Sequence, residues 1–328
     1  MSTKSERIRC VVLGGGTGIH PVLLAAQHLD IDCTSIVTVA DSGGSTGILR
    51  DLYDLPAVGD LRQSLTGMLS PTADQILGKL LEYRFQTGAG LKGHTLGNLL
   101  LTALQDLTKS TTQAAKVAGE LFSINGTVLP VTEANTQLQI TYTDGSSIVG
   151  QHHLNEKTST AKKIDQISYT TAAPLNPAAR AAIEQADILI IGPGDYYDSI
   201  LATLIVDGIP AACAATQAKI VYMVNLMTSQ TRTKNMTARD HVQGIEKALG
   251  KKVTHIVINN EAIPSETVAK YALADSSPVR DDLGEDSRVI RAALISDEQF
   301  VQNPADSVER SLLRHSHTKL QTILETLL

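Results

Sequence analysis

The strongest constraint on the fold is a repeated pattern near the N-terminus, in which an apolar run ends abruptly in a glycine-rich turn. The first run, "RIRCVVL", leads into "GGGTG" at residues 14–18, and the second, "CTSIVTVA", leads into "DSGGSTG" at residues 41–47. Between them, "HPVLLAAQHL" has the apolar spacing of a helix. Strand, helix and strand in this order form a βαβ unit, whose connection makes the two strands parallel.

The same alternation returns in the second half of the chain. "NPAARAAIEQA" and "TARDHVQGIEKALG" predict helices, and "DILIIGPGD", "AKIVYMVNLM" and "VTHIVINN" predict buried strands. We therefore predict an α/β fold with a doubly wound, Rossmann-like, mostly parallel sheet in a three-layer α/β/α arrangement. Residues 1–328 are expected to form this fold as a single domain.

Additional helices and an insertion are predicted around this sheet. Residues 60–83 and 95–122 have helical spacing, with Asp60 and Thr95 as the expected N-caps. Residues 304–328 predict an amphipathic C-terminal helix.

Residues 125–172 differ from the rest of the chain, because three runs in this range alternate polar and apolar residues. Asp144-Gly145 between two of these runs is typical of a hairpin turn. We predict that this range is an antiparallel β-hairpin insertion, and that "GTVLPVT" belongs to it.

Composition argues against several classes of protein. The chain of 328 residues has a formal net charge of -6, which disfavours a general nucleic-acid binder. Its three cysteines are far apart and form no CxxC pair, as is typical of a reducing cytosol. The polar start "MSTKSERIR" lacks a signal core, and no apolar stretch approaches the roughly 20 residues that cross a bilayer. We expect a cytoplasmic protein that binds neither membranes nor nucleic acids.

The most unusual residues follow the ends of predicted strands. They are Gly14-Gly15-Gly16-Thr17-Gly18, Asp41-Ser42-Gly43-Gly44-Ser45, Gly192-Pro193-Gly194 and Asn225. Loops at the carboxyl ends of parallel strands converge and hold ligands. Glycines there expose backbone N–H groups, and a following helix favours an anion. The pattern predicts a ligand that carries phosphate, but the dinucleotide motif G-x-G-x-x-G fails because Ile19 stands where the last glycine would be.

The chain resembles the CofD-like superfamily in motifs that run in order from about residue 8 to 260. These are "VVLGGGTG", "IVTVADSGGSTGILR", "GDLR", "LKGHTLGNLLL", "NGTVLPVT", "ADILIIGPGDYYDSI", "KIVYMVNLMT" and "DHV". The branch that it resembles more closely is that of the YvcK-type gluconeogenesis factors. The resemblance implies a cytoplasmic bacterial protein that binds a nucleotide-sugar of the UDP-N-acetylglucosamine type. It also implies a role in carbon flow toward cell-wall precursors and in cell shape.

The resemblance assigns the two glycine turns to the diphosphate and sugar sides of one nucleotide pocket. The Gly14–Gly18 turn would bind phosphate through its backbone, while Ser42 and Ser45 would donate hydroxyl hydrogen bonds. Asp41 would accept a sugar hydroxyl, hold a divalent cation in a transferase, or cap its own turn. Arg62 would contact a phosphate or pair with Asp41.

Five more positions are candidates. His94, Thr95 and Asn98 in "GHTLGN" begin a predicted helix, where anions bind. Asn225 would recognise a base or sugar, or would satisfy loop backbone. Asp195 stands where the family usually has a small hydroxyl residue, a change that would weaken a phosphate contact or recruit a metal.

The C-terminal third carries further matches and departures. Tyr271 and Arg314 resemble nucleotide-sugar contacts of YvcK-type proteins. The tail after Arg314 reads His-Ser-His, whereas the family commonly has His-Asp. The loop after "NLMT" tends to be rich in glycine and acids in the family, whereas here it carries Arg232 and Lys234.

We favour a nucleotide-sugar-binding regulator without catalytic residues, a required cofactor or a metal. It is expected to form a homo-oligomer and to have an enzyme of the amino-sugar pathway as a partner. The alternative is an enzyme like the related 2-phospho-L-lactate transferases, with a guanylylated donor, a deazaflavin acceptor and Mg²⁺. A deazaflavin needs aromatic stacking, and the chain has no Trp and 3 Phe, although Tyr side chains could contribute. No Ser-His-Asp order or GxSxG element indicates hydrolysis.

Overall fold

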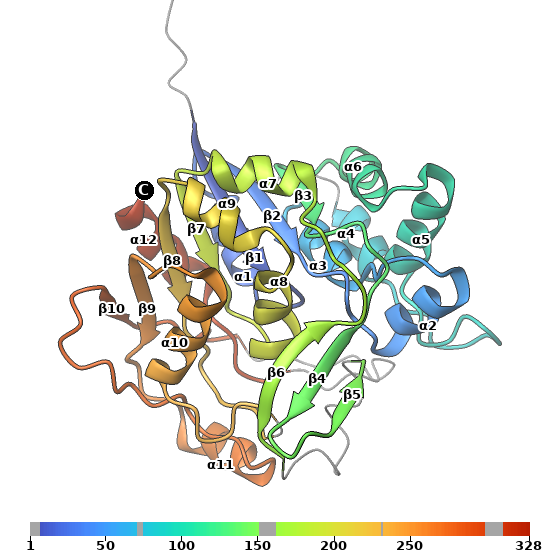
Figure 1. Ribbon diagram of the computed structural model, residues 1–328. Helices are drawn as coiled ribbons and strands as arrows, with labels where there is room; N and C mark the ends of the chain where they lie inside the picture. Colours follow the sequence, from blue (N-terminus) through green and yellow to red (C-terminus); the bar gives the residue numbers. More distant parts are fainter. Residues whose placement is uncertain (1–6, 71–74, 151–161, 231, 299–310) are drawn as a thin grey trace, which may run out of the picture.

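Seven parallel strands form the central sheet of the protein, in the order β10-β9-β8-β7-β1-β2-β3 (Figure 1). The computed structural model describes residues 7–70, 75–150, 162–230, 232–298 and 311–328. The strands are β1 (Ile8–Gly14), β2 (Ile31–Val37), β3 (Thr127–Pro130), β7 (Ile188–Ile191), β8 (Lys219–Met223), β9 (His255–Asn259) and β10 (Val289–Ala292). The order reverses between β1 and β7, so the doubly wound sheet predicted from the sequence is confirmed.

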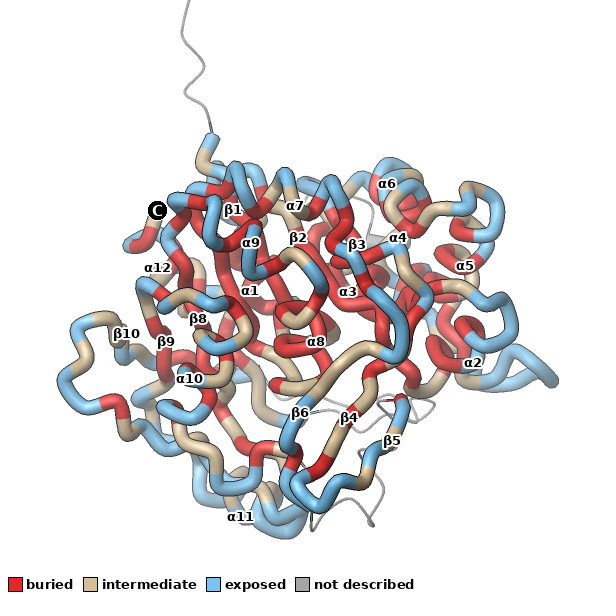
Figure 2. The backbone as a smooth tube through the Cα atoms, viewed as in Figure 1, coloured by how far each residue is buried: buried red, intermediate tan, exposed pale blue. Residues whose placement is uncertain are grey.

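Both faces of the sheet are buried. In β1, Val11 and Leu13 belong to one apolar core, while Cys10 and Val12 belong to a second core on the opposite face. Successive side chains of a strand point to opposite faces, so an uninterrupted apolar run is what a doubly covered strand requires. Figure 2 shows these central strands as buried.

Helices cover the two faces and complete the three predicted layers. The first core includes side chains from α7 (Pro177–Glu184), the π-helical turn η3 (Tyr196–Leu201), α8 (Ala202–Leu204), α9 (Ile209–Ala215) and α10 (Ala238–Leu249). The second core includes side chains from α1 (His20–Ala26), α3 (Gly59–Gly67), α4 (Gln75–Glu82), α5 (Leu96–Thr108), α6 (Thr111–Phe122) and α12 (His317–Leu327). The remaining helices, α2 (Gly44–Tyr53) and α11 (Ser265–Leu273), lie toward the lower edge of the molecule in Figure 1.

The predicted insertion is a separate three-stranded antiparallel sheet in the order β5-β4-β6. Its strands are β4 (Leu138–Tyr142), β5 (Ser147–Val149) and β6 (Ile164–Tyr169). The prediction was wrong for "GTVLPVT", because β3 pairs with β2 in parallel within the main sheet. The antiparallel sheet lies below the carboxyl ends of the parallel strands in Figure 1.

One predicted helix start is confirmed and two differ from the structure. Thr95 is the N-cap of α5 and accepts the N–H of Asn98, as expected. Asp60, however, lies in the first turn of α3, whose N-cap is Val58. The predicted C-terminal helix from residue 304 begins among residues outside the described part of the chain, and the described helix starts only at His317.

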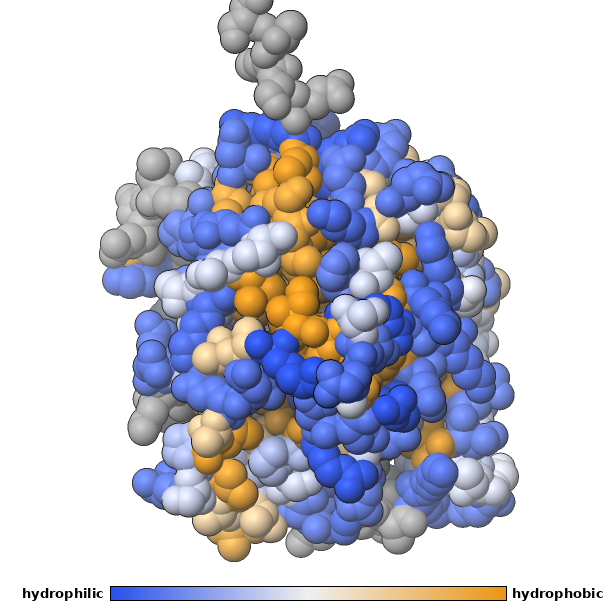
Figure 3. Space-filling model, turned by 90° about the vertical axis from the view of Figure 1, so that its left-hand side faces the viewer, coloured by the Kyte–Doolittle hydropathy of each residue, from blue (hydrophilic) through white to orange (hydrophobic). Residues whose placement is uncertain are grey.

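The sheet ends at β10, whose side chains are only partly buried or exposed. Figure 3 shows the side of the molecule on which β10 lies, and a band of hydrophobic residues crosses that side. Within the described ranges, no helix is long and apolar enough to cross a membrane.

Candidate functional site

The glycine turns that follow β1 and β7 pack directly against each other at the carboxyl edge of the sheet. A Cβ atom at Gly18 would overlap Pro193 and Gly194, so only glycine permits this approach. Asn225, which follows β8, joins the same edge by donating from Nδ2 to the Gly194 carbonyl at 2.7 Å. With this bond Asn225 satisfies loop backbone, which was one of the two roles expected for it, while its buried Oδ1 accepts no hydrogen bond from the residues that the structure describes.

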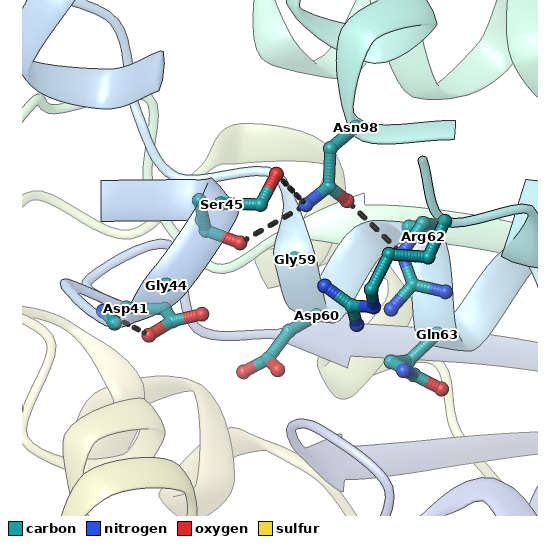
Figure 4. Close-up of a pocket in the computed structure, with 11 residues that line it drawn as sticks. Asp41, Gly44, Ser45, Gly59, Asp60, Arg62, Gln63 and Asn98 are labelled. Carbon is teal, nitrogen blue, oxygen red and sulfur yellow. Dashed lines mark hydrogen bonds between the residues drawn. The ribbon is translucent and has the colours of Figure 1, made fainter. Parts of the chain in front are cut away.

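A polar pocket lies beside these turns, where α2, α3 and α5 begin (Figure 4). Its lining residues are Asp41, Gly43, Gly44, Ser45, Thr46, Gly59, Asp60, Arg62, Gln63, Arg84 and Asn98. Three helix N-termini therefore converge with two arginines and two carboxylates. Helix N-termini and arginines favour an anion, and carboxylates accept hydrogen bonds from hydroxyl groups.

The second glycine turn leads directly into α2, which begins at the pocket. Asp41 Oδ1 accepts the N–H of Gly43 at 2.9 Å, so Asp41 caps its own turn. Gly44 begins α2 with φ +49°, a left-handed conformation that favours glycine. The N-cap residue of this helix is Gly43, which has no side chain that could occupy the first N–H groups. The first N–H groups of α2 are thus placed where an anion in the pocket could accept from them.

A chain of hydrogen bonds fixes the polar side chains on one wall. Arg62 Nε donates to Asn98 Oδ1 at 3.0 Å, and Asn98 Nδ2 donates to Ser45 Oγ at 3.1 Å and to Thr46 Oγ1 at 3.3 Å. Ser45 Oγ lies 2.9 Å from His94 Nδ1. All five side chains are buried.

The direction of this chain follows from Arg62, which can only donate. Arg62 makes the Asn98 oxygen the acceptor, so the Asn98 amide group must donate to Ser45. The Ser45 hydroxyl can then donate to His94 Nδ1. Burial lowers the pKa of His94, and the charge of Arg84 lowers it further, so at neutral pH its ring is neutral and accepts this bond in the tautomer that carries its proton on Nε2.

Asp60 connects the pocket to the first glycine turn. Its carboxylate lies against Gly15 and Gly16, where a Cβ atom at Gly15 would overlap it. The Gly14–Gly18 turn itself does not line the pocket but lies behind Asp60.

The structure thus brings together only some of the predicted site residues. Asp41, Gly43, Gly44, Ser45, Arg62 and Asn98 line the pocket, and His94 and Thr95 contact the residues that do. Ser42 is buried beside it, while Gly14–Gly18, Gly192–Gly194 and Asn225 form the neighbouring turns.

Tyr271 and Arg314 do not line the pocket. The Tyr271 hydroxyl lies 2.7 Å from Ser311 Oγ and accepts the N–H of Leu313, so it connects α11 with the segment before α12. Arg314 follows in that segment, and its charge acts on His20 at the start of α1.

Sequence reasoning missed four lining residues, Thr46, Gly59, Gln63 and Arg84, and Asp60, which was expected to be an N-cap, lines the pocket as well. The first three stand in or next to motifs that were already singled out. No sequence motif marked Arg84 as a site residue, because it reaches the start of α5 only through the pairing of residues 84 and 95.

Of the two aspartates suggested for a divalent cation, Asp195 has both oxygens engaged by protein groups. Asp195 Oδ1 accepts the N–H of Asp198 at 3.0 Å, and Asp195 Oδ2 pairs with Arg232. Within the described part of the chain, no group of three or more His, Cys, Asp or Glu side chains could hold a metal ion.

Comparison with known proteins decides the family. The model of the family described as 2-phospho-L-lactate transferase CofD matches residues 10–298. The chain belongs to the CofD family. Among curated relatives, the gluconeogenesis factor of Bacillus subtilis is 32% identical over 326 residues, which cover 98% of this chain and 99% of the relative. The putative gluconeogenesis factor of Thermotoga maritima is 31% identical over 321 residues, covering 97% and 98%.

A solved structure agrees with this assignment. A member of the UPF0052 family from Bacillus halodurans superposes with a TM-score of 0.89 and 30% identity, covering 98% of this chain and 99% of that one. The names of the curated relatives place the chain in the YvcK-type branch, as its motifs predicted. They support a regulatory role in this branch of the CofD family.

Proposed function

We propose that the pocket binds a nucleotide-sugar of the UDP-N-acetylglucosamine type. The observation that carries this proposal is the convergence of Arg62, Arg84 and the starts of α2, α3 and α5 with Asp41 and Asp60 in one pocket. The arginines and helix starts suit a diphosphate, and the two carboxylates suit the hydroxyl groups of a sugar.

We further propose that the protein with its nucleotide-sugar bound acts as a regulator of central carbon flow, cell-wall precursor supply and cell shape. The relatives named gluconeogenesis factor support the metabolic part of this role. In this proposal the protein is a cytoplasmic homo-oligomer without a required cofactor, and the ligand controls its contact with an enzyme of the amino-sugar pathway.

The second candidate is a 2-phospho-L-lactate transferase-like enzyme, which the description of the family model favours. Its deazaflavin acceptor would need a flat aromatic partner. Among the described residues that line the pocket, none is aromatic, which favours the regulator.

Turnover needs its own test, because the structure pairs a hydroxyl with a base. The motifs predict no pair of nucleophile and base, yet Ser45 lies within hydrogen-bonding distance of His94. Asn98 occupies one acceptor position of the same Ser45 oxygen, and the lowered pKa makes His94 a weak base. We expect incubation with UDP-N-acetylglucosamine and Mg²⁺ to leave the ligand intact. Release of UMP or free sugar that Ser45→Ala abolishes would show an enzyme instead.

Binding is tested by calorimetric titration with UDP-N-acetylglucosamine, GDP and NAD, using wild type and Gly44→Ala. A side chain at φ +49° costs about 1–2 kcal/mol of stability and crowds the pocket, so Gly44→Ala should lose both stability and affinity. Gly250→Ala is the matched control, because Gly250 has φ +65° at the end of α10, away from the lining residues. It should lose stability alone. Preference for GDP or NAD over the UDP-sugar contradicts the proposal.

A further inference from the structure

Arg232, in the segment between β8 and α10, is buried between two carboxylates at the start of η3. Its Nη2 lies 2.8 Å from Asp198 Oδ2, and its Nη1 pairs with Asp195 Oδ2. The Arg232 and Asp198 side chains are only 9% and 7% exposed. Asp195 and Arg232 were singled out separately as departures from the family pattern, and the structure shows that they contact each other.

One carboxylate of the pocket, that of Asp60, lies near this ion pair. Gly16 connects them in space, because Asp60 Oδ1 and Ser199 Oγ both lie within 4 Å of the position that a Gly16 Cβ atom would take. Ser199 directly follows Asp198. Burial raises the pKa of Asp198, the charge of Arg232 lowers it, and the charges of Asp195, Asp41 and Asp60 raise it again. The charges of four carboxylates and of Arg232 therefore act on one another at this edge of the sheet, in addition to Arg62 and Arg84 of the pocket.

Such a group of carboxylates weakens the attraction of Arg62 and Arg84 for a diphosphate unless a further cation offsets its charge. In many phosphate sites Mg²⁺ offsets the charge of the carboxylates, because carboxylate and phosphate oxygens both coordinate it. A guanidinium can serve the same purpose, because it stays charged and makes two directed bonds at once. Both oxygens of Asp195 are already engaged, one by Arg232 and one by the N–H of Asp198.

We propose that Arg232 takes the place of a divalent cation at this edge, so that the protein binds a diphosphate ligand without a metal. The inference rests on the proposed function, since it concerns the ligand of the same pocket. Asp195 and Asp198 hold the guanidinium in place, and its charge offsets Asp41 and Asp60. Arg232 is a positioning residue for the ligand in this arrangement.

The first test titrates wild-type protein with UDP-N-acetylglucosamine in EDTA and again with Mg²⁺. Equal affinity in the two conditions supports the inference. Binding that requires Mg²⁺ overturns the inference and leaves the proposed function standing. Absence of binding in both conditions overturns the proposed function, and the second test then decides the inference without any nucleotide.

The second test measures thermal unfolding of the ligand-free protein in EDTA, with Mg²⁺ alone and with Mn²⁺ alone. Arg232→Gln should unfold at a lower temperature in EDTA and recover with Mn²⁺, because the carboxylates then lack their cation. Wild type should not respond to either metal. Lys234→Gln is the matched control, because Lys234 lies in the same segment and pairs with Asp275 at the surface.

Stabilisation of wild type by Mn²⁺, or failure of folded Arg232→Gln to respond, overturns the inference. If Arg232→Gln does not fold, the double variant Arg232→Gln/Asp198→Asn removes one charge of each sign and should fold without a metal. Its affinity for UDP-N-acetylglucosamine in EDTA should fall by about tenfold or more, because Arg232 then no longer offsets the charges of Asp41 and Asp60. Unchanged affinity of that variant also overturns the inference.

Discussion

Hydrogen bonds connect the buried side chains of the pocket in a chain that runs from Arg62 through Asn98 and Ser45 to His94. Arg62 is 4% exposed and donates to Asn98, so its removal would leave the buried Asn98 oxygen without this donor. An unsatisfied buried acceptor costs about 1–3 kcal/mol. Arg62 therefore contributes to the stability of the ligand-free protein as well as to the charge of the pocket.

The direction of this chain can be tested with Asn98→Asp. A carboxylate at this position would still accept from Arg62 but would also accept from the Ser45 hydroxyl, which would then stop donating to His94. The neutral form of His94 would lose a donor and gain a nearby negative charge, so we expect the pKa of His94 to rise. NMR titration measures it, with His255 on β9 as an internal control that should not change. An unchanged His94 pKa would mean that Ser45 does not donate to this ring.

The local sequence pattern predicts some of the helices and strands but not others. The buried strands and the first βαβ unit were predictable, because an apolar run that ends in a glycine turn is typical of a buried parallel strand. The place of β3 was not, because the crossover that returns it to β2 runs through five helices that local alternation does not reveal. Asp60 is a good N-cap residue by type, yet the N-cap of α3 is Val58, two residues earlier. Arg84 reaches the pocket only through the pairing of residues 84 and 95, which has no local signature.

Tertiary contacts also decide how α6 begins. Glu133, in the segment after β3, accepts the N–H groups of Thr111 and Thr112 at 2.8 Å each. Burial would raise the pKa of Glu133, but hydrogen bonds from Thr112, Thr111 and Ser110 outweigh it and hold the pKa below its ordinary value. The carboxylate thus caps a helix from a different part of the chain.

A pH-dependent loss of stability should follow from Glu133→Gln. Because the folded pKa is lowered, this carboxylate stabilises the fold above its unfolded pKa, and the contribution disappears as the pH falls through the folded pKa. We expect the variant to lose about 0.5–2 kcal/mol at pH 7 and to approach wild type in acid. Urea unfolding across pH measures the difference, with Glu120→Gln on the exposed face of α6 as control. A loss that stays constant down to low pH would contradict the capping role.

At the scale of the whole molecule, the small antiparallel sheet shares its core with the parallel one. Ile167, Tyr169 and Tyr197 pack against both the first core and the cluster formed by β4, β6 and α8. The Tyr169 hydroxyl donates to the carbonyl of Ala202 at 2.5 Å. Side chains that belong to two cores couple the sheets, so neither should unfold alone.

We therefore expect one unfolding transition, with calorimetric and van't Hoff enthalpies that agree. Tyr169→Phe removes the hydroxyl that reaches α8 but keeps the ring that both cores share. It should lower the melting temperature through a loss of about 0.5–1.5 kcal/mol, and the transition should stay single. Scanning calorimetry of wild type and variant measures both properties. Two transitions in wild type would show that β4, β5 and β6 unfold as an independent unit. The small sheet would then not be fixed to the carboxyl ends of the parallel strands.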